Sequence, residues 1–307
     1  MQRSITGMRR RKWRQSNMIE VENAILMAAG MSTRMAPLSY EIPKALLKIE
    51  GEVLIERQIL QLRESGIRDI TIVVGYKKEQ FAYLKEKFEV KLIENPYYME
   101  RNNHSSLFVA RKELKNTYIS CGDYYFAQNP FRRKEEVPYY GLTYQEGETP
   151  EWCVETDESG KIQKVVIGGK DAWVMQGEVL FDRTFSRQLI PLLESAMERE
   201  EEKQTYWEDL YVSSLGTMDL YGKQKKKGEV LEFDSLDELR ETFPWYRAAK
   251  DSRIFQKILA TLNCEEGELT GFVPLKENGV AKGVTFSLRE QTYRYFYESG
   301  KLERCRI

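Results

Sequence analysis

Residues 27–35 read Met27-Ala28-Ala29-Gly30-Met31-Ser32-Thr33-Arg34-Met35, and Pro43-Lys44 follows shortly after them. A strand that ends in small residues lets backbone amides approach a polyphosphate closely. Arg34 can place its guanidinium fork across phosphate oxygens, and Lys44 can supply a point charge nearby. The segment therefore predicts a phosphate-handling loop with Arg34 and Lys44 as catalytic residues, and nucleotide contacts from Ala28, Ala29, Gly30, Met31 and Ser32.

An ordinary strand and turn with surface charges is the alternative interpretation of this loop. The short run Ala28-Ala29-Gly30 fits both interpretations equally well. Arg34, however, lies four residues after Gly30, and Lys44 lies fourteen residues after it. This joint spacing favours the phosphate-binding loop.

Short apolar runs alternate with helical periodicity from residue 24 to residue 126. The alternation predicts right-handed βαβ units and a mostly parallel sheet, so the fold class is α/β, with a Rossmann-like mixed sheet flanked by helices. Ligands bind beyond the carboxyl ends of the strands in such sheets. Gly30, Gly75 and Asp123 each follow a predicted strand, so we expect them along one edge, with Gly75 in contact with the nucleotide. The predicted strands are 24–29, 70–74, 90–93 and 118–121, and the predicted helices are 54–65, 81–88 and 105–114.

Beyond residue 126 the sequence no longer alternates between strand and helix patterns. Alternating apolar residues predict four strands, and helices and a further strand follow them. Asp234 and Ser235 are predicted to cap a helix, and the domain boundary is expected near Pro244. We therefore predict a basic tail at 1–20 outside the fold, a catalytic domain at 21–244, and a small appendage of helix and strands at 245–307. The predicted strands are 139–144, 152–156, 162–167, 172–181, 230–233 and a meander at 270–297; the predicted helices are 184–202, 206–215, 236–242 and 254–262.

The composition excludes several classes of function. The net charge is −1, so no global field favours nucleic acid or an anionic membrane. No apolar run approaches the roughly 20 residues that a membrane span needs. The single histidine gives little support to zinc or Ser-His-Asp chemistry, and the cysteines form no CxxC pair. We expect a cytoplasmic protein with reduced thiols, no nucleic-acid partner and no membrane insertion. The four cysteines are Cys121, Cys153, Cys264 and Cys305.

The loop resembles that of the nucleoside-diphosphate-sugar pyrophosphorylase superfamily, AAGxGxRxxPL…PK. The sequence is most similar to the bacterial phosphocholine cytidylyltransferases of this superfamily, over about residues 24–243. The resemblance implies a nucleotidyltransferase fold. It departs at Ser32, where the family often has a second glycine, and we expect a slightly altered loop geometry there.

The resemblance also implies a metal site. In the family, an aspartate after a central strand and an E-x-D segment near the end of the domain supply the ligands, and Asp123 and Asp234 match these positions. Carboxylates suit Mg²⁺, which neutralises charge on a pyrophosphate leaving group. Asp234 also fits a plain helix N-cap. Some relatives carry a second acid before the first aspartate, but this chain has Gly122, so the predicted site has few spare ligands.

Aromatic residues beside acids indicate where a cationic acceptor binds, because quaternary ammonium groups prefer aromatic faces. Trp152, Tyr206, Trp207 and Glu208 align with the family's acceptor region. Core packing is the alternative role for these aromatics. The turn at 102–106 resembles the family's Asn-rich turn, which places Asn103 and Ser105 near the nucleotide, or gives them simple capping roles. His104 is expected to be structural or exposed rather than catalytic.

Residues 267–301 faintly resemble the first hairpin of choline-kinase-like phosphotransferases. We expect either a remnant or an accessory module there, and homo-oligomer formation is one candidate role for such a module.

The resemblance implies transfer of a cytidylyl group from CTP to phosphocholine, giving CDP-choline and pyrophosphate by Mg²⁺-assisted in-line attack. Two alternatives stay open: the same chemistry on 2-aminoethylphosphonate, phosphoethanolamine or a sugar 1-phosphate, and a catalytically silent nucleotide-binding scaffold.

Overall fold

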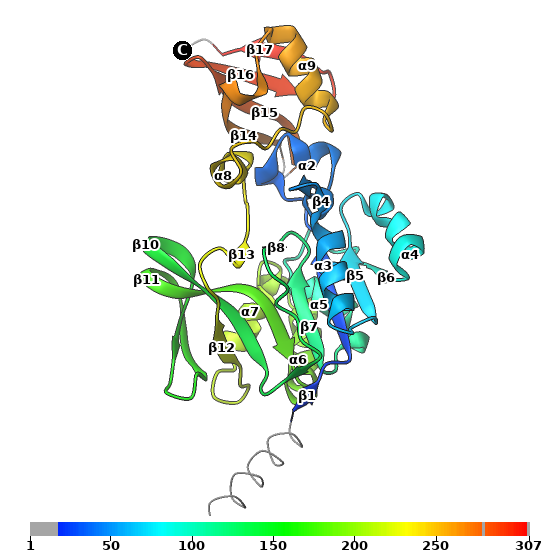
Figure 1. Ribbon diagram of the computed structural model, residues 1–307, viewed down its shortest axis with the longest axis vertical. Coiled ribbons are helices and arrows are strands. Elements are labelled where there is room, and N and C mark those ends of the chain that lie inside the picture. Colours follow the sequence, from blue (N-terminus) through cyan, green and yellow to red (C-terminus); the bar gives the residue numbers. More distant parts are fainter. Residues whose placement is uncertain (1–17, 278–279, 306–307) are drawn as a thin grey trace, which may run out of the picture. The chain divides into compact units, whose positions relative to one another are not determined.

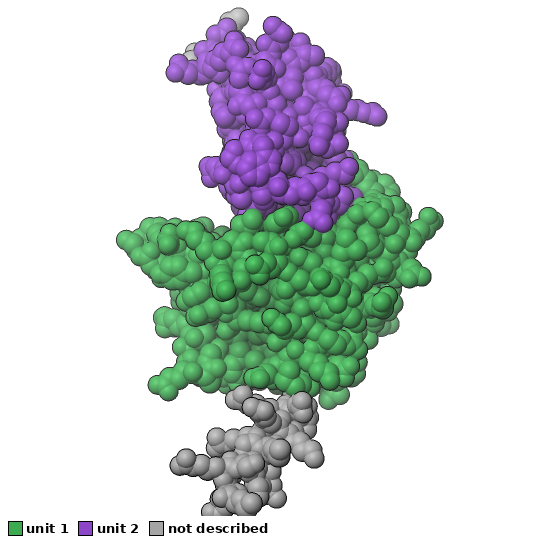
Figure 2. Space-filling model, in the orientation of Figure 1, with its two compact units in different colours: residues 1–29, 55–231 green, residues 30–54, 232–307 purple. Residues whose placement is uncertain are grey.

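The computed structural model describes residues 18–277 and 280–305, which form two compact units that interleave along the chain (Figure 2). The first unit comprises the residues up to Ala29 and Ile55–Leu231, and the second comprises Gly30–Leu54 and the residues from Glu232 onward. The boundary predicted near Pro244 falls inside the second unit. Residues 1–17 of the predicted tail lie outside the described residues.

A seven-stranded sheet forms the centre of the first unit, as far as the described residues show (Figure 1). Its order is β12-β10-β11-β7-β2-β5-β6, and the pairs within β7-β2-β5-β6 are parallel. β11 joins β7 antiparallel, so the sheet is mixed but mostly parallel, and the predicted α/β class is confirmed. The strands are β2 (Asn23–Ala28), β5 (Ile70–Val74), β6 (Lys91–Glu94), β7 (Thr117–Cys121), β10 (Tyr139–Thr156), β11 (Ile162–Phe181) and β12 (Tyr221–Gln224).

Helices cover both faces of this sheet. On one face, Ile25 and Ile119 of the strands join a buried core with Leu189 of α6 and Trp207 of α7. On the other face, α3 packs through apolar residues and a buried glutamine, Gln58, that reaches the end of β7. The helices are α3 (Leu54–Glu64), α4 (Tyr83–Phe88), α5 (His104–Val109), α6 (Arg183–Glu198) and α7 (Trp207–Val212).

Strands β10 and β11 form one long bent hairpin. Four separate strands were predicted here, and that prediction is wrong, because bulges interrupt the alternation without ending the pairing. Gly147 and Gly168 adopt φ of +80° where the register shifts, a conformation that glycine adopts easily. Cys153 pairs with both Val166 and Val174, so the distal part of the hairpin turns back on its base.

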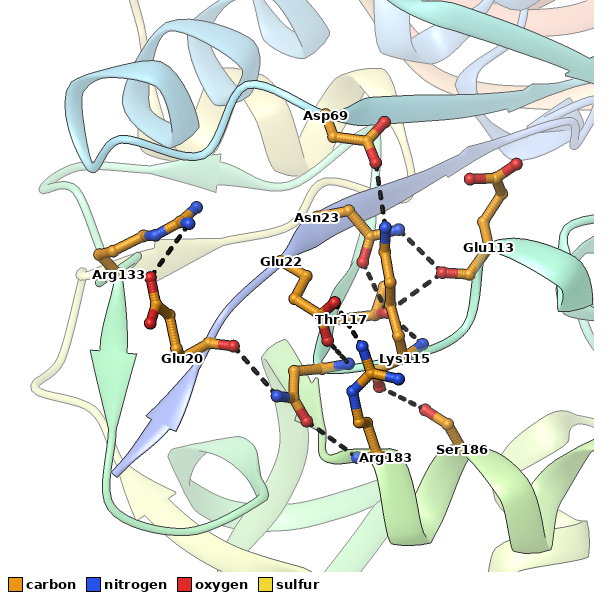
Figure 3. A network of polar contacts seen from close by, with 11 residues as sticks. Glu20, Glu22, Asn23, Asp69, Glu113, Lys115, Thr117, Arg133, Arg183 and Ser186 are labelled. Carbon is orange, nitrogen blue, oxygen red and sulfur yellow. Dashed lines mark hydrogen bonds and ion pairs between the residues drawn. The ribbon is translucent and has the colours of Figure 1, made fainter. Parts of the chain in front are cut away.

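A polar network fixes the amino ends of the parallel strands, opposite the end where ligands bind in such sheets (Figure 3). The Thr117 hydroxyl donates to Asn23 Oδ1 at 2.7 Å, and Asn23 Nδ2 donates to the Glu113 carbonyl at 2.8 Å. Lys115 lies 3.2 Å from Asp69 in the loop before β5. Burial raises the pKa of Asp69, but hydrogen bonds from Lys91 and Lys115 outweigh it and lower that pKa. The network holds β2, β5 and β7 in register at one end.

The second unit contains a four-stranded antiparallel sheet of β14-β15-β16-β17, which confirms the predicted meander. Its members are β14 (Leu269–Glu277), β15 (Val280–Leu288), β16 (Gln291–Phe296) and β17 (Leu302–Arg304), with α8 (Leu236–Thr242) and α9 (Arg253–Leu262) before them. The same unit holds η1 (Thr33–Met35), α2 (Leu38–Glu41), η2 (Lys44–Leu46), β3 (Lys48–Ile49) and β4 (Glu52–Val53).

Short elements complete the two units. None of the helices in the described ranges has the length and apolar character needed to cross a membrane. The short elements are β1 (Ile19–Glu20), which pairs with β9 (Lys134–Glu135), β8 (Tyr125–Phe126), which pairs with β13 (Val230–Leu231), and η3 (Lys78–Phe81), η4 (Arg111–Glu113), η5 (Glu200–Glu202) and η6 (Glu266–Glu268).

Candidate active site

Two cations of the predicted phosphate loop meet one carboxylate within the second unit. Arg34 Nη1 lies 2.8 Å from Asp234 Oδ2, and Lys44 Nζ lies 3.7 Å from Asp234 Oδ1. The side chain of Arg34 is 69% exposed, whereas that of Lys44 is 5% exposed. We call these three residues the charged cluster. It presents one exposed and one buried positive group around a half-buried acid.

The local sequence explains why Asp234 is available to the cations. Ser235, not Asp234, is the N-cap of α8, because its hydroxyl accepts a hydrogen bond from the backbone N–H of Glu238 at 3.2 Å. The interpretation of Asp234 as a plain N-cap is therefore wrong. Its carboxylate faces Arg34 and Lys44 instead.

The loop backbone accounts for the family's second glycine. Ser32 has φ 45° and ψ 47°, in the left-handed region that only glycine occupies without cost. A Cβ added at Gly30 would meet no atom within 4 Å. Gly30 therefore leaves open space beside the backbone, which suits the close approach of a ligand.

In the first unit, three predicted site residues lie at the carboxyl ends of neighbouring strands. Ala29 follows β2, Gly75 follows β5 and Asp123 follows β7, and β2 lies between the other two. The Ala29 carbonyl accepts from Tyr76 N at 3.0 Å. A Cβ at Gly75 would lie 2.8 Å from both that carbonyl and the Tyr98 ring, so packing alone requires glycine here.

Gln58, which sequence reasoning missed, fixes the turn that carries Asp123. Its amide nitrogen donates to the Cys121 carbonyl at 2.8 Å and to the Tyr124 carbonyl at 3.0 Å, and its oxygen accepts from Ser120 Oγ at 2.8 Å. Gln58 is fully buried. The available signal was a polar residue on the apolar face of the helix that contains Ile55, Ile59 and Leu62.

The chemistry of the donor set fits Mg²⁺. Mg²⁺ is commonly held by one or two carboxylates together with substrate phosphates and water, rather than by a cage of protein ligands. No group of three or more His, Cys, Asp or Glu residues able to hold a metal occurs in the described part of the chain. Asp123, half-buried in the first unit, and Asp234, in the second, remain predicted ligands.

An aromatic pair marks the predicted acceptor region of the first unit. The rings of Trp152, on β10, and Tyr206, just before α7, lie 6.2 Å apart at 73°. Tyr206 is 44% exposed, and Trp152 is half-buried. Such an edge-to-face pair offers an accessible aromatic surface to a cation.

Trp207 and Glu208, the next two residues of the chain after Tyr206, are both buried. Trp207 is fully buried and stacks on Tyr140, with ring centroids 5.8 Å apart. Glu208 accepts from Asn103 Nδ2 at 3.0 Å and from the Tyr140 hydroxyl at 3.2 Å. Burial raises the pKa of Glu208 to about 7, although both hydrogen bonds lower it. Asn103 also accepts from Trp207 N at 2.8 Å, so it ties the Asn-rich turn to α7.

The remaining residues of this turn have structural partners. The buried Ser105 hydroxyl donates to the Asn102 carbonyl at 2.7 Å and accepts from Asn95 Nδ2 at 2.9 Å. His104 Nδ1 lies 2.6 Å from the Thr205 carbonyl, and burial lowers the pKa of His104. The helix that follows, α5, has six residues. Sequence and structure agree on a structural His104.

Comparisons with known proteins identify the family of the chain. Residues 24–131 match the MobA-like NTP transferase domain. The chain is 34% identical to a choline-phosphate cytidylyltransferase from Streptococcus pneumoniae, over 71% of this chain and 95% of that protein. It is 36% identical to a 2-aminoethylphosphonate cytidylyltransferase from Lancefieldella rimae, over 72% of this chain and 91% of that protein.

Solved structures give the same result. The CTP:phosphocholine cytidylyltransferase from Streptococcus pneumoniae matches with a TM-score of 0.70 and 34% identity, covering 72% of this chain and 97% of that chain. An inositol-1-phosphate CTP transferase from T. maritima matches with a TM-score of 0.57 and 20% identity, covering 73% of this chain and 94% of that chain, which supports the fold alone.

Proposed function

The chain belongs to the nucleotidyltransferase family that includes the choline-phosphate and 2-aminoethylphosphonate cytidylyltransferases, and we propose that it transfers the cytidylyl group of CTP to phosphocholine. The products are CDP-choline and pyrophosphate. The Trp152–Tyr206 pair carries the choice of acceptor, because its accessible aromatic surface suits a quaternary ammonium. We place the reaction in the cytoplasm, in keeping with four cysteines that form no disulfide in the described structure.

The transfer needs no covalent enzyme intermediate. An oxygen of the acceptor phosphate attacks the α-phosphorus of CTP in line, the bond from that phosphorus to the bridging oxygen breaks, and pyrophosphate leaves with the bond electrons. Arg34 and Lys44 bind the phosphate oxygens and stabilise the charge that develops on them. Arg34 is exposed enough to turn from Asp234 to a triphosphate, whose charge exceeds that of one carboxylate.

We propose Mg²⁺ as the cofactor, with Asp123 and Asp234 as protein ligands. Bound Mg²⁺ supplies charge neutralisation for the leaving pyrophosphate. Asp123→Asn is expected to abolish turnover while the unfolding midpoint stays near that of the unmodified chain. Asp219→Asn is the control, since Asp219 lies at the surface in an ion pair with Lys161. Near-normal activity of Asp123→Asn would remove its metal assignment.

2-Aminoethylphosphonate is the second candidate acceptor, because one relative acts on it by name. Its primary ammonium would favour an ionised carboxylate over an aromatic surface. Glu208 fits that role poorly, because its carboxyl is held by Asn103 and Tyr140 and its pKa is raised to about 7. This observation favours phosphocholine.

Pyrophosphate release from CTP, measured with a panel of acceptors, tests the proposal. The panel is phosphocholine, 2-aminoethylphosphonate, phosphoethanolamine and a sugar 1-phosphate. We expect the highest kcat/KM with phosphocholine. A higher value with another member moves the assignment to that acceptor, and no release with any member supports a silent scaffold.

Trp152→Ala tests the acceptor site directly. Loss of one cation–π contact, worth about 0.5–2 kcal/mol, predicts a rise in KM for phosphocholine of about 2- to 30-fold. Trp173→Ala is the matched control, because Trp173 packs against Tyr144 on the same hairpin. An unchanged KM in Trp152→Ala would count against the aromatic site.

A further inference from the structure

Residues 30–54, which include Arg34 and Lys44 of the phosphate loop, belong to the same compact unit as the C-terminal sheet. We propose that Tyr40, Glu41 and Tyr297 are positioning residues that fasten the phosphate loop to the C-terminal module, defined as residues 252–305. The module then sets the positions of Arg34 and Lys44 for catalysis and is part of the working enzyme. This inference rests on the proposed function for its kinetic test, and on geometry alone for its structural test.

Glu41, the last residue of α2, caps a helix that lies far away in the sequence. Its carboxylate accepts from the hydroxyl of Ser252, from Arg253 N at 3.0 Å and from Ile254 N at 3.4 Å. Ser252 itself is the N-cap of the ten-residue helix α9. The first N–H groups of a helix lack partners within the helix, and a negative charge there is favourable. Glu41 therefore joins the phosphate loop to α9 across 211 positions of sequence.

Tyr40 makes a second contact with the module. Its ring stacks on that of Tyr297, with centroids 3.9 Å apart and planes 21° apart. Tyr297 is buried, so water does not loosen the stack. The ring of Tyr295, near the end of β16, in turn contacts that of Tyr297, with centroids 6.3 Å apart. Two adjacent loop residues thus contact both the helix and the sheet of the module.

The segment that carries Asp234, the third residue of the charged cluster, also contacts the C-terminal sheet. Asp234 leads into α8, where Asp237 Oδ2 accepts from Phe272 N of β14 at 3.1 Å. Arg240, also on α8, donates to the Leu269 carbonyl at 2.9 Å and lies 2.6 Å from the buried Glu266. Both elements belong to the second unit, and Figure 1 shows α8 beside β14. Both segments that meet in the charged cluster therefore depend on the module.

This arrangement matters because phosphoryl chemistry depends on placement. A misplacement of about 1 Å can cost on the order of 100-fold in rate. The side chain of Arg34 is mostly exposed and pairs with Asp234, so its position depends on the two backbone segments that carry these residues. The segment that carries Arg34 runs directly into Tyr40 and Glu41.

The kinetic test compares Glu41→Gln and Tyr297→Ala with the unmodified chain. We expect kcat/KM for CTP to fall about 10-fold or more in both variants. KM for phosphocholine should stay within about 2-fold, because Trp152 and Tyr206 belong to the other unit. Tyr297→Phe keeps the ring and should restore the activity lost in Tyr297→Ala. Glu303→Gln is the control, since Glu303 forms an exposed pair with Lys301 in the same module.

Hydrogen exchange of residues 30–54, measured without nucleotide, is the structural test. We expect faster exchange in Glu41→Gln and Tyr297→Ala and no change in Glu303→Gln. Unchanged kcat/KM for CTP with unchanged exchange in Glu41→Gln would overturn the proposal, even if Tyr297→Ala does not fold. Parallel losses for CTP and phosphocholine would also overturn it, by indicating general destabilisation. If the unmodified chain transfers no cytidylyl group, the proposed function fails, and the exchange of residues 30–54 still decides the positioning role.

Discussion

The carboxyl group of Glu208 lies in a buried environment, where its ionised form is unfavourable. It is buried, and its two oxygens accept from Asn103 and Tyr140. Burial outweighs these hydrogen bonds and raises the pKa to about 7 from the ordinary 4.5. The folded protein therefore keeps a proton that the unfolded chain releases in mildly acidic solution.

The raised pKa predicts a pH-dependent stability. Between pH 4.5 and about 7 the folded state binds more protons than the unfolded state, so the free energy of unfolding falls as the pH rises through this window. Across this window, the titration of Glu208 lowers the free energy of unfolding by roughly 2–4 kcal/mol. Glu208→Gln can keep both partners, with its amide donating to Tyr140, and should remove this slope. Urea unfolding at pH 5 and pH 8 measures the pH dependence of the free energy of unfolding in the unmodified chain and in Glu208→Gln. The same pH dependence in both proteins would contradict the raised pKa of Glu208.

The left-handed backbone conformation of Ser32 makes the stability of the loop sensitive to the residue at this position. An L-residue in the left-handed region costs roughly 1 kcal/mol relative to glycine. Ser32→Gly is expected to change the free energy of unfolding by no more than about 1 kcal/mol, since glycine also gains entropy in the unfolded chain. Ser32→Val should destabilise, because β-branched residues avoid positive φ. Urea unfolding compares the two, and a glycine variant less stable than the valine variant would argue against the left-handed backbone.

At the scale of elements, α3 fastens the turn that follows β7. Gln58 makes three buried hydrogen bonds to this turn and to β7 itself. Gln58→Ala leaves two carbonyls without this donor, at a cost of about 1–3 kcal/mol. We expect kcat to fall, because Asp123 is carried by the loosened turn. Gln61→Ala is a control on the same helix, since Gln61 Nε2 donates to the Phe126 carbonyl instead. Equal activities of the two variants would show that the turn does not depend on Gln58.

Local elements were predictable where one periodicity ran without interruption. The parallel strands β2, β5 and β7 followed from apolar runs, because nearly every residue of these strands is buried, and helix α3 followed from amphipathic spacing, because it buries one face. The β10–β11 hairpin did not, since its bulges break the alternation that marks a strand. Among predicted site residues, Arg34, Lys44 and Asp234 meet in the structure, while Trp207 lies in the core.

The contacts that join residues 30–54 to the C-terminal module could not be predicted from the sequence. Glu41 reads as an ordinary surface acid, and Ser252 as an ordinary N-cap, until the fold brings them together across 211 positions. Neither residue carries a local pattern that names its partner. Contacts between segments so far apart depend on the whole topology, which hydrophobic periodicity does not encode.

At the scale of the whole molecule, the chain passes between the two units three times, after Ala29, Leu54 and Leu231. Residues 30–54 are thus tied at both ends to the first unit, yet Tyr40 and Glu41 among them contact the C-terminal part of the second unit. The folding of the phosphate loop should follow the second unit, because its stabilising partners are there.

Phe255→Ala tests this dependence. Phe255 is fully buried in α9 and packs edge-on against Phe272 of β14 at 5.5 Å, so its loss should cost about 3–5 kcal/mol. We expect faster hydrogen exchange in residues 253–296 and, together with them, in residues 30–54, while β2, β5 and β7 keep their protection. Phe185→Ala, in the core of the first unit, should give the opposite pattern. A phosphate loop that stays protected while α9 exchanges would show that the first unit holds it instead, and nucleotide binding would then survive the loss of the C-terminal sheet.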